Sequence, residues 1–466
     1  MKDKKLYLVA NFVFIFFPYF LYGQEDKSQE LNTLLNEGKY FESRKLYKEI
    51  CDVISPDMDL FYKFQMAQFM NKNDSAAIYI ENMLIDYPDM FGNNTIFVYA
   101  RLFDIYAVSL RNYEKSVCTY KRMVQHLKDN PYHLDEKELA LWKDGNKTRV
   151  DYLKQLMSQP PIKLKRGSVN SSVSFKSDKK QLVIDVKTNG MSQKTLVDTG
   201  CNFYYIMNRG KAEELGLECA VSEMSKGVIN NTEMLIKQVI VDSIEIGNIT
   251  LYNIPATIFE YDITQYLPDS VKQQQESFAQ IEPLYTNITN PIIGLPIMKL
   301  IGKFLIDYEK QAVSFPSITF RLDSLIDSNM FLYNAYLYTQ LKLNKKDFTG
   351  TLDIGFDEYM MIDSLFYERY QNDIPTVSMA EKDSYNIVMV HQFYNNIPYK
   401  IAHNLSIEFN NKRVSPPLGK DIKIYSMQPV FLPMKIFDGI IGYDFFRRLG
   451  KRVLLDFDNM RLEVEE

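Results

Sequence analysis

The last two thirds of the chain contain one succession of short β-prone segments twice. In the first copy, an aspartate turn, a Ser-Ile-Glu segment and an Ile-Ile-Gly segment occur in that order, at Asp198, Ser243 and Gly294. Their counterparts follow 155, 163 and 148 residues later, at Asp353, Ser406 and Gly442. Three matches in the same order arise by chance far less readily than one motif. The duplication therefore predicts two related β lobes.

A predicted β-hairpin leads to the aspartate in each copy. Apolar and polar residues alternate over Gln181–Lys187, and Asn189-Gly190 then provides the turn signal that suits twisted antiparallel strands. The chain resumes a β-prone pattern and reaches Asp198. In the second copy a hairpin leads in the same way to Asp353. The sequence therefore places both aspartates at the ends of equivalent strands.

Two carboxylates at such positions can form a catalytic pair. Gly200 and Gly355 follow the aspartates by two residues and permit tight turns, so the side chains can approach closely. Carboxyl groups about 3 Å apart cannot both ionise and share one proton. The ionised member can activate a water, while the protonated member polarises a carbonyl. The alternative for Asp198 is a turn-capping role, and Asp357 and Asp363 are rivals to Asp353.

Other chemistries have little support in the sequence. The formal net charge of −5 argues against a nucleic-acid partner, which needs a concentrated basic face. The 4 histidines are scattered, and no Cys/His cluster has the spacing of metal ligands. There is no convincing Ser-His-Asp or Cys-His arrangement. We therefore expect no metal and no cofactor.

The first third of the chain has a helical period and almost no strand signal. Similar half-repeats place Tyr47, Tyr79 and Tyr120 at intervals of 32 and 41 residues. These intervals are close to the 34-residue tetratricopeptide period, and the region resembles a short array of such helical hairpins. This predicts a concave surface for a peptide or a partner protein. A helical spacer or cap that binds nothing is an equal alternative.

The N-terminus has the layout of a secretory signal, with lysines followed by the apolar run Leu6–Gly23. Cleavage after residue 23 is favoured over an uncleaved anchor, for which the run is barely long enough. Export would permit disulfides. Cys51 with Cys118, or Cys201 with Cys219, are potential pairs, although free buried thiols are the simpler expectation.

The residues around the first aspartate resemble a known family. Leu196–Gly200 and Ile292–Leu295 resemble the catalytic Asp-Thr-Gly and the later hydrophobic-Gly signature of aspartic peptidases. The tail, with Ile440–Phe446 and Leu455–Phe457, resembles the closing segment of bacterial retropepsin-like proteins. The likeness covers about residues 165–466. It implies hydrolysis of peptide bonds by a water activated between Asp198 and Asp353.

The resemblance also assigns supporting roles. Gly294 and Gly442 would pack beside the active-site loops, and a β-hairpin flap would have its tip within Ser225–Thr232. The hydroxyl of Thr199 would bond across the lobe interface, although a local turn bond is nearly as well supported. Ile354 stands where the family has Thr or Ser and cannot make the reciprocal bond. This substitution puts the placement of Asp353 in doubt.

Together these patterns predict a multidomain chain: an all-α, tetratricopeptide-like module followed by an all-β, bilobal aspartic-peptidase-like domain. The expected bounds are a signal peptide at 1–23, the helical module at 24–162, and the β lobes at 163–318 and 319–466. We expect an exported bacterial protein of the periplasm or cell envelope, secreted or N-terminally anchored, that acts on polypeptides. A monomer with an intrachain pair is favoured over a homodimer. The alternative function is a catalytically impaired peptide- or protein-binding protein.

Overall fold

The structure is a computed structural model that describes most of the chain. The described residues are 25–130, 136–168, 171–176, 181–217, 225–229, 232–259, 290–323, 327–378, 384–389, 392–416, 422–425 and 437–465. Contacts divide these residues into a helical unit that runs to Pro161 and includes Phe331–Asn334, and a β unit formed by the rest from Ile162 onward.

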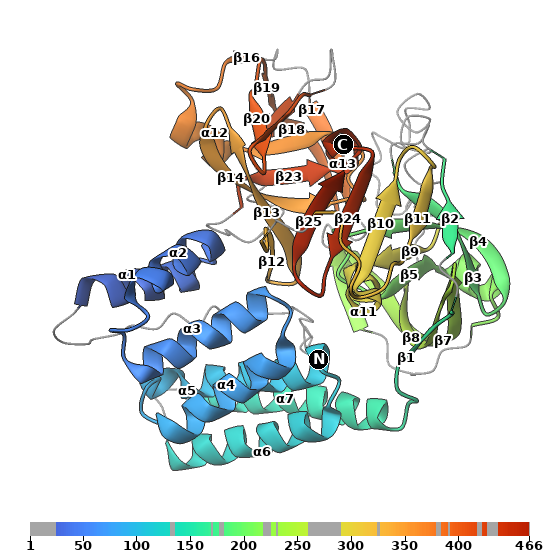
Figure 1. Ribbon diagram of the computed structural model, residues 1–466. Helices are drawn as coiled ribbons and strands as arrows, with labels where there is room; N and C mark the ends of the chain where they lie inside the picture. The colour runs from blue at the N-terminus through green and yellow to red at the C-terminus, as the bar shows by residue number, and fades with distance from the viewer. Residues whose placement is uncertain are drawn as a thin grey trace. The chain divides into compact units, whose positions relative to one another are not determined.

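The helical unit consists of helices that pack in chain order as successive pairs (Figure 1). They are α1 (Glu25–Asn36), α2 (Tyr40–Ile50), α3 (Pro56–Phe69), α4 (Asn73–Asp86), η1 (Gly92–Asn94), α5 (Thr95–Asp104), η2 (Ile105–Ser109), α6 (Tyr113–Asp129) and α7 (Glu136–Met157). Tyr47, Tyr79 and Tyr120 lie in α2, α4 and α6, the second helix of each pair. The first part of the chain that the structure describes is therefore helical, whereas its tetratricopeptide character stays a prediction.

The first lobe of the β unit is a closed sheet. Its elements are β1 (Lys163–Arg166), β3 (Val183–Thr188), β4 (Met191–Asp198), β5 (Tyr205–Asn208), α8 (Arg209–Glu214), β6 (Ser225–Ile229), β7 (Thr232–Ile246), β8 (Ile249–Phe259), β9 (Ile292–Gly294) and α11 (Leu295–Ile301). The strands run in the order β8-β5-β9-β4-β3-β7, and β7 also pairs with β8. This last pairing closes a barrel, because no strand of the six is left at an edge.

The second lobe repeats this order, and its described strands form an open sheet. Its elements are β12 (Met330–Tyr333), β13 (Tyr336–Leu343), β14 (Lys346–Asp353), β15 (Met360–Asp363), α12 (Ser364–Tyr370), β16 (Thr376–Ser378), β17 (Ser384–Met389), β18 (Gln392–Pro398), β19 (Lys400–Ala402), β20 (Ile407–Phe409), β21 (Lys412–Val414), β22 (Ile422–Tyr425), β23 (Gly439–Gly442) and α13 (Tyr443–Leu449). The order β22-β15-β23-β14-β13-β20 matches that of the first barrel strand by strand. The two predicted lobes are therefore present.

The hairpins that carry the aspartates have the same register in both lobes. Val183 pairs with Leu196 two residues before Asp198, and Tyr338 pairs with Thr351 two residues before Asp353. Each hairpin closes through a two-residue turn in which both residues have positive φ, at Asn189-Gly190 and Asn344-Lys345. Such turns match the twist of paired strands, so they fix the register that places each aspartate.

A separate sheet joins the two lobes inside the β unit. It runs β2 (Ser172–Ser174), β11 (Ala312–Ser314), β10 (Lys303–Asp307), β24 (Arg452–Asp456) and β25 (Arg461–Glu465). The central pair, β10 with β24, is antiparallel and brings together the closing strands of the two copies. The side chains of β10 are all buried, so the junction is a continuous part of the core.

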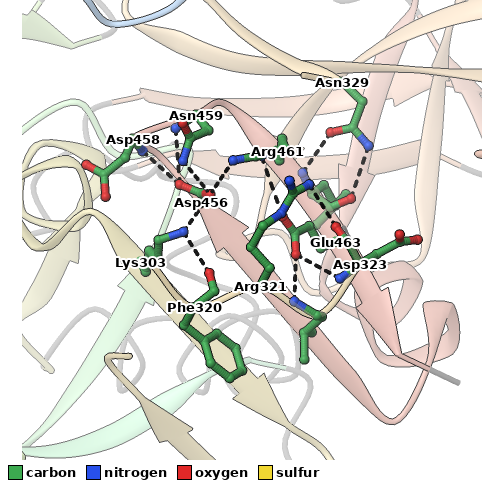
Figure 2. Close-up of polar contacts among 12 residues, drawn as sticks. Lys303, Phe320, Arg321, Asp323, Asn329, Asp456, Asp458, Asn459, Arg461 and Glu463 are labelled. Atoms are coloured by element: carbon green, nitrogen blue, oxygen red, sulfur yellow. Dashed lines mark hydrogen bonds and ion pairs between the residues drawn. The ribbon is translucent and has the colours of Figure 1, made fainter. Parts of the chain in front are cut away.

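Buried charges tie this sheet to the segment between the lobes. Figure 2 shows Lys303 beside Asp456, with Nζ to Oδ2 at 2.7 Å and both side chains almost fully buried. The same Nζ donates to the carbonyl of Phe320 at 2.9 Å. Fully buried Glu463 accepts the backbone N–H of Leu322 at 2.7 Å. The connection between the lobes is thus held by hydrogen-bonded charges, as buried charges require.

The β unit begins with an edge strand, because β1 pairs with β8 from Lys163 to Arg166. All four side chains of β1 are exposed, so this edge strand has no apolar alternation to reveal it.

The cysteines differ from the expectation of buried thiols. Cys51 and Cys118 are free but exposed, because they lie at the end of α2 and on the outer face of α6. Cys201 is free and buried. Cys219 and the predicted signal segment lie outside the described residues. None of the helices described is both long and apolar enough to span a membrane.

Candidate active site

The two aspartates lie together where equivalent strands of the two lobes end. Asp198 is the last residue of β4 and stands opposite Gly294 of the parallel strand β9. Asp353 is the last residue of β14 and stands opposite Gly442 of the parallel strand β23. Their carboxyl groups hydrogen-bond to each other. The structure therefore brings together the pair that the sequence singles out, and both side chains stay partly open to solvent.

The glycines after the aspartates allow this approach. A Cβ on Gly200 would lie 2.5 Å from Oδ2 of Asp353, and a Cβ on Gly355 would lie 2.3 Å from Cγ of Asp198. Each glycine thus lies against the carboxyl group of the opposite lobe. Any side chain at either position would push the pair apart.

The glycines of β9 and β23 make room for the loops that follow the aspartates. A Cβ on Gly294 would lie 2.0 Å from the carbonyl oxygen of Phe203, and one on Gly442 would lie 2.1 Å from that of Glu358. These contacts are with backbone atoms, which cannot turn aside as a flexible side chain can. Gly294 and Gly442 therefore pack beside the two loops.

Thr199 bridges the lobes through its hydroxyl. The fully buried Oγ1 donates to the carbonyl of Leu352 at 2.7 Å and accepts the N–H of Ile354 at 2.9 Å. The bond across the interface, rather than a local turn bond, is therefore the one formed. The side chain of Ile354 is fully buried and has no hydroxyl to return. The first lobe therefore contributes the side chain of Thr199 to the bridge, and the second lobe contributes only backbone groups.

Backbone N–H groups point at both carboxyl groups. Oδ1 of Asp198 accepts the N–H of Gly200 at 2.7 Å, and the N–H groups of Cys201 and Gly355 also contact this carboxyl. Oδ1 of Asp353 accepts the N–H of Phe356 at 3.0 Å, with Gly355 again contributing. Such bonds favour the charged form of a carboxyl group. The pair can therefore hold one negative charge.

The surroundings of the pair differ for its two members. Burial raises the pKa of both carboxyl groups above the ordinary value. For Asp198 the hydrogen bond from Asp353 and the backbone N–H groups oppose this rise in pKa. For Asp353 the charge of Asp198 and the hydrogen bond between them raise the pKa further, well above the usual range. Both carboxyl groups therefore resist ionisation, and the two titrate together as one pair.

Residues 184–267 match the family model described as gag-polyprotein putative aspartyl protease. This segment resembles aspartyl proteases. It contains Asp198, so the resemblance to the retropepsin-like family is confirmed for this part of the first lobe. Asp353 lies outside the matched residues.

Solved structures with a similar arrangement include a retropepsin-like aspartic protease from Rickettsia conorii, at 16% identity and a TM-score of 0.23, covering 34% of this chain and 95% of that chain. Basic 7S globulin from soybean matches at 12% identity and a TM-score of 0.34, covering 65% of this chain and 94% of its own. Conglutin gamma from lupine seeds matches at 10% identity and a TM-score of 0.32. This match covers 64% of this chain and 94% of that chain. No curated protein sequence matches the chain.

The predicted aspartyl-protease flap falls partly on described residues. Strands β6 and β7 pair as a hairpin, with Ile229 opposite Thr232. The two residues at its tip, 230 and 231, lie outside the described residues. Asp363, a rival of Asp353, accepts the N–H of Leu365 at the start of α12. It is an N-cap residue and no partner for Asp198.

Sequence reasoning missed two residues beside the pair. The side-chain amide of Gln181 donates to the carbonyl of Gly355 at 3.2 Å. Tyr336 occupies the place in the second hairpin that Gln181 has in the first, two residues before the first strand pair. Burial and then the charge of Asp353 raise the pKa of Tyr336. The matched hairpin registers would have pointed to both positions.

In the described part of the chain, no group of three or more His, Cys, Asp or Glu is arranged to hold a metal ion. The thiol of Cys201, next to the pair, is buried, and this burial raises its pKa well above the ordinary value. A neutral thiol is a poor nucleophile. The thiol of Cys201 is therefore not a candidate nucleophile.

Proposed function

We propose that the chain is an aspartic-type endopeptidase that hydrolyses peptide bonds with water. The observation that carries the proposal is the hydrogen-bonded pair of Asp198 and Asp353, held by backbone N–H groups between two related lobes. The family match to aspartyl proteases favours a polypeptide as the substrate.

The asymmetry of the pair suggests the role of each carboxyl group. Ionised Asp198 takes a proton from a bound water, whose oxygen attacks the scissile carbonyl carbon. Protonated Asp353 gives its proton to the carbonyl oxygen, which yields a tetrahedral gem-diol. The C–N bond then breaks as Asp198 passes its proton to the leaving nitrogen. Asp353 recovers a proton from the gem-diol, and the pair returns to its starting state.

Cleavage of a mixed-sequence peptide library by the full chain, followed by mass spectrometry, tests the proposal. We expect internal cleavages that Asp198→Asn reduces by at least about a thousandfold, since the general base is lost. A statine-containing peptide, which mimics the gem-diol, should inhibit. Cleavage that is unchanged in Asp198→Asn would contradict the proposal, as would a wild-type chain that cleaves nothing between pH 3 and 8.

A second candidate function is supported by Ile354. The family hydroxyl is absent at this position, and a peptidase fold that binds peptides without cutting them would tolerate the loss. Ile354→Thr separates the two candidates. A gain of a hundredfold or more would show that the natural site is impaired, because a placement error of about 1 Å costs about that much. A change of less than about threefold would favour the enzyme.

A further inference from the structure

Gln181 connects the first lobe to the loop of Asp353 through one peptide unit. Its Nε2 donates to the carbonyl oxygen of Gly355 at 3.2 Å. The N–H of the same peptide unit, that of Phe356, donates to Oδ1 of Asp353 at 3.0 Å. A peptide unit is planar, so the direction of its C=O also sets the direction of its N–H. Gln181 therefore fixes a donor that points at the carboxyl of Asp353.

The bond polarises the peptide as well as orienting it. A carbonyl that accepts a hydrogen bond makes the N–H of its peptide a stronger donor, and the effect is larger where water is excluded. The carboxyl group of Asp353 is enclosed by Asp198, Gly200 and the backbone of its own loop. A stronger donor at this place stabilises negative charge on Asp353 during the reaction.

The hydrogen bond from Gln181 acts on the same loop as the two hydrogen bonds of Thr199. Side chains of the first lobe hold the second loop at the carbonyl of Leu352, the N–H of Ile354 and the carbonyl of Gly355. Asp353 thus lies between two anchored stretches of backbone. The buried side chain of Ile354 adds only apolar packing.

We propose that Gln181 is a positioning residue for Asp353 and compensates for the hydroxyl missing at Ile354. This inference rests on the proposed peptidase function and adds a residue to its site. The hairpin does not itself require a glutamine, because the matched place in the second lobe is filled by Tyr336, a side chain of another shape. The hydrogen bond to the carbonyl of Gly355 therefore explains why position 181 is a glutamine.

Gln181→Ala tests the proposal in the full chain. We expect kcat to fall about tenfold with little change in KM, since one hydrogen bond that orients the acid is lost and substrate contacts are kept. The loss weakens a donor to the charged form of Asp353. The upper limb of the pH–rate profile should therefore move to higher pH.

Gln181→Glu keeps the shape of the side chain but replaces the donor with an oxygen that faces the carbonyl of Gly355, so kcat should fall at least as far as in Gln181→Ala. Ser192→Ala, an exposed change on the same hairpin, is the matched control and should leave both kcat and the profile unchanged. Combining Gln181→Ala with Ile354→Thr tests the compensation. If Gln181 stands in for the hydroxyl, its loss should cost less when threonine is present at 354.

A titration without substrate separates this inference from the proposed function. Carboxyl carbons of 13C-labelled aspartate report protonation of the pair directly, and Gln181→Ala should raise the upper of its two apparent pKa values. If Asp198→Asn abolishes cleavage while Gln181→Ala leaves kcat, the pH profile and the titration unchanged, only the positioning role is wrong. If Asp198→Asn has no effect on cleavage, the peptidase assignment fails, and the titration still decides whether Gln181 acts on Asp353.

Discussion

At the scale of single residues, the site depends on backbone that approaches a carboxyl group too closely for any side chain. Gly200 and Gly355 each lie against the aspartate of the opposite lobe. This reciprocal arrangement explains why glycine follows both aspartates at the same spacing. It also explains how two loops that differ at most other positions still form one pair.

Gly355→Ala should therefore inactivate the site. Its Cβ would lie 2.3 Å from Cγ of Asp198, so this carboxyl group must move out of the pair, and we expect kcat/KM to fall by at least about a hundredfold. Gly210→Ala is the matched control, because its Cβ would meet nothing closer than Oδ1 of Asn208 at 3.7 Å. Comparable activity of the two variants in the peptide assay would contradict this account.

Only some residues of the site could be predicted from the sequence. Asp198 and Gly200 belong to a motif whose chemistry can be read directly, and Asp353 follows from the duplication. The bridge at Thr199 was only one of two expectations, because a hydroxyl in a turn can bond locally or across an interface. Gln181 was missed, since a glutamine before a strand has no motif and its partner lies 174 residues away.

At the scale of elements, a buried carboxyl group, that of Asp438, lies directly before β23. Oδ2 of Asp438 accepts the N–H of Thr349 at 2.8 Å, and Oδ1 forms an ion pair with Arg369 of α12. Asp363 of β15 lies near and adds to a rise in pKa caused mainly by burial. The pKa of Asp438 is raised from 3.8 to about 6. Protonation of Asp438 therefore changes the charge next to β23, the strand that pairs with β14 beside Asp353.

The raised pKa of Asp438 makes the folded chain less stable at neutral pH than at acidic pH. Since the folded chain binds this proton more tightly than the unfolded chain, the stabilisation is complete below about pH 4 and is lost as pH rises through about 6. Asp438→Asn removes this loss, on the order of 3 kcal/mol. Urea unfolding at pH 4 and at pH 7 should show a smaller decrease in stability for Asp438→Asn than for the wild type. An equal decrease in both proteins would contradict the role of Asp438.

The sheet between the lobes offers a second test at this scale. Lys303→Ala leaves the buried carboxylate of Asp456 without its ammonium partner, and we expect unfolding of the β unit to need about 3 kcal/mol less. Lys310→Ala removes a lysine that is 79% exposed from Asp307, the counterpart of Asp456, and should cost less than about 1 kcal/mol. Denaturant unfolding of both variants measures the difference, and equal costs would contradict the importance of burial.

Elements were predictable where the local pattern and the fold agree. The Asn189-Gly190 turn signals its hairpin, and the repeated Ile-Ile-Gly segments indicate β9 and β23. The strand β1 was not predictable, because its exposed side chains of Lys163–Arg166 show no alternation and only its backbone pairs with β8. Partners distant in sequence, rather than local propensity, determine such edge strands.

At the scale of the whole chain, both aspartates come from one polypeptide. Activity should therefore not depend on self-association. We expect the cleavage rate per chain to stay constant on dilution from micromolar to nanomolar concentration, with light scattering that reports a single chain. A rate per chain that falls with dilution, together with dissociation of a dimer, would show that the working pair is assembled between two chains.

The duplication gave the two lobes and their order, because strands that must pair in the same way keep the same sequence order. It did not give the difference between the lobes. The first closes through pairing of β7 with β8, and the second ends as an open sheet in the part of the chain that the structure describes. The pair that closes the first lobe is a local hairpin, because only Gly247 and Asn248 separate β7 from β8.

The most direct test of the two-carboxylate account is the activity of Asp353→Asn in the peptide assay, measured beside Asp357→Asn as the matched change four residues later in the same loop. The account predicts that Asp353→Asn lowers kcat by at least about a thousandfold, since the acid that polarises the carbonyl is lost, and that Asp357→Asn stays within about threefold of the wild type. Full activity of Asp353→Asn would contradict the account.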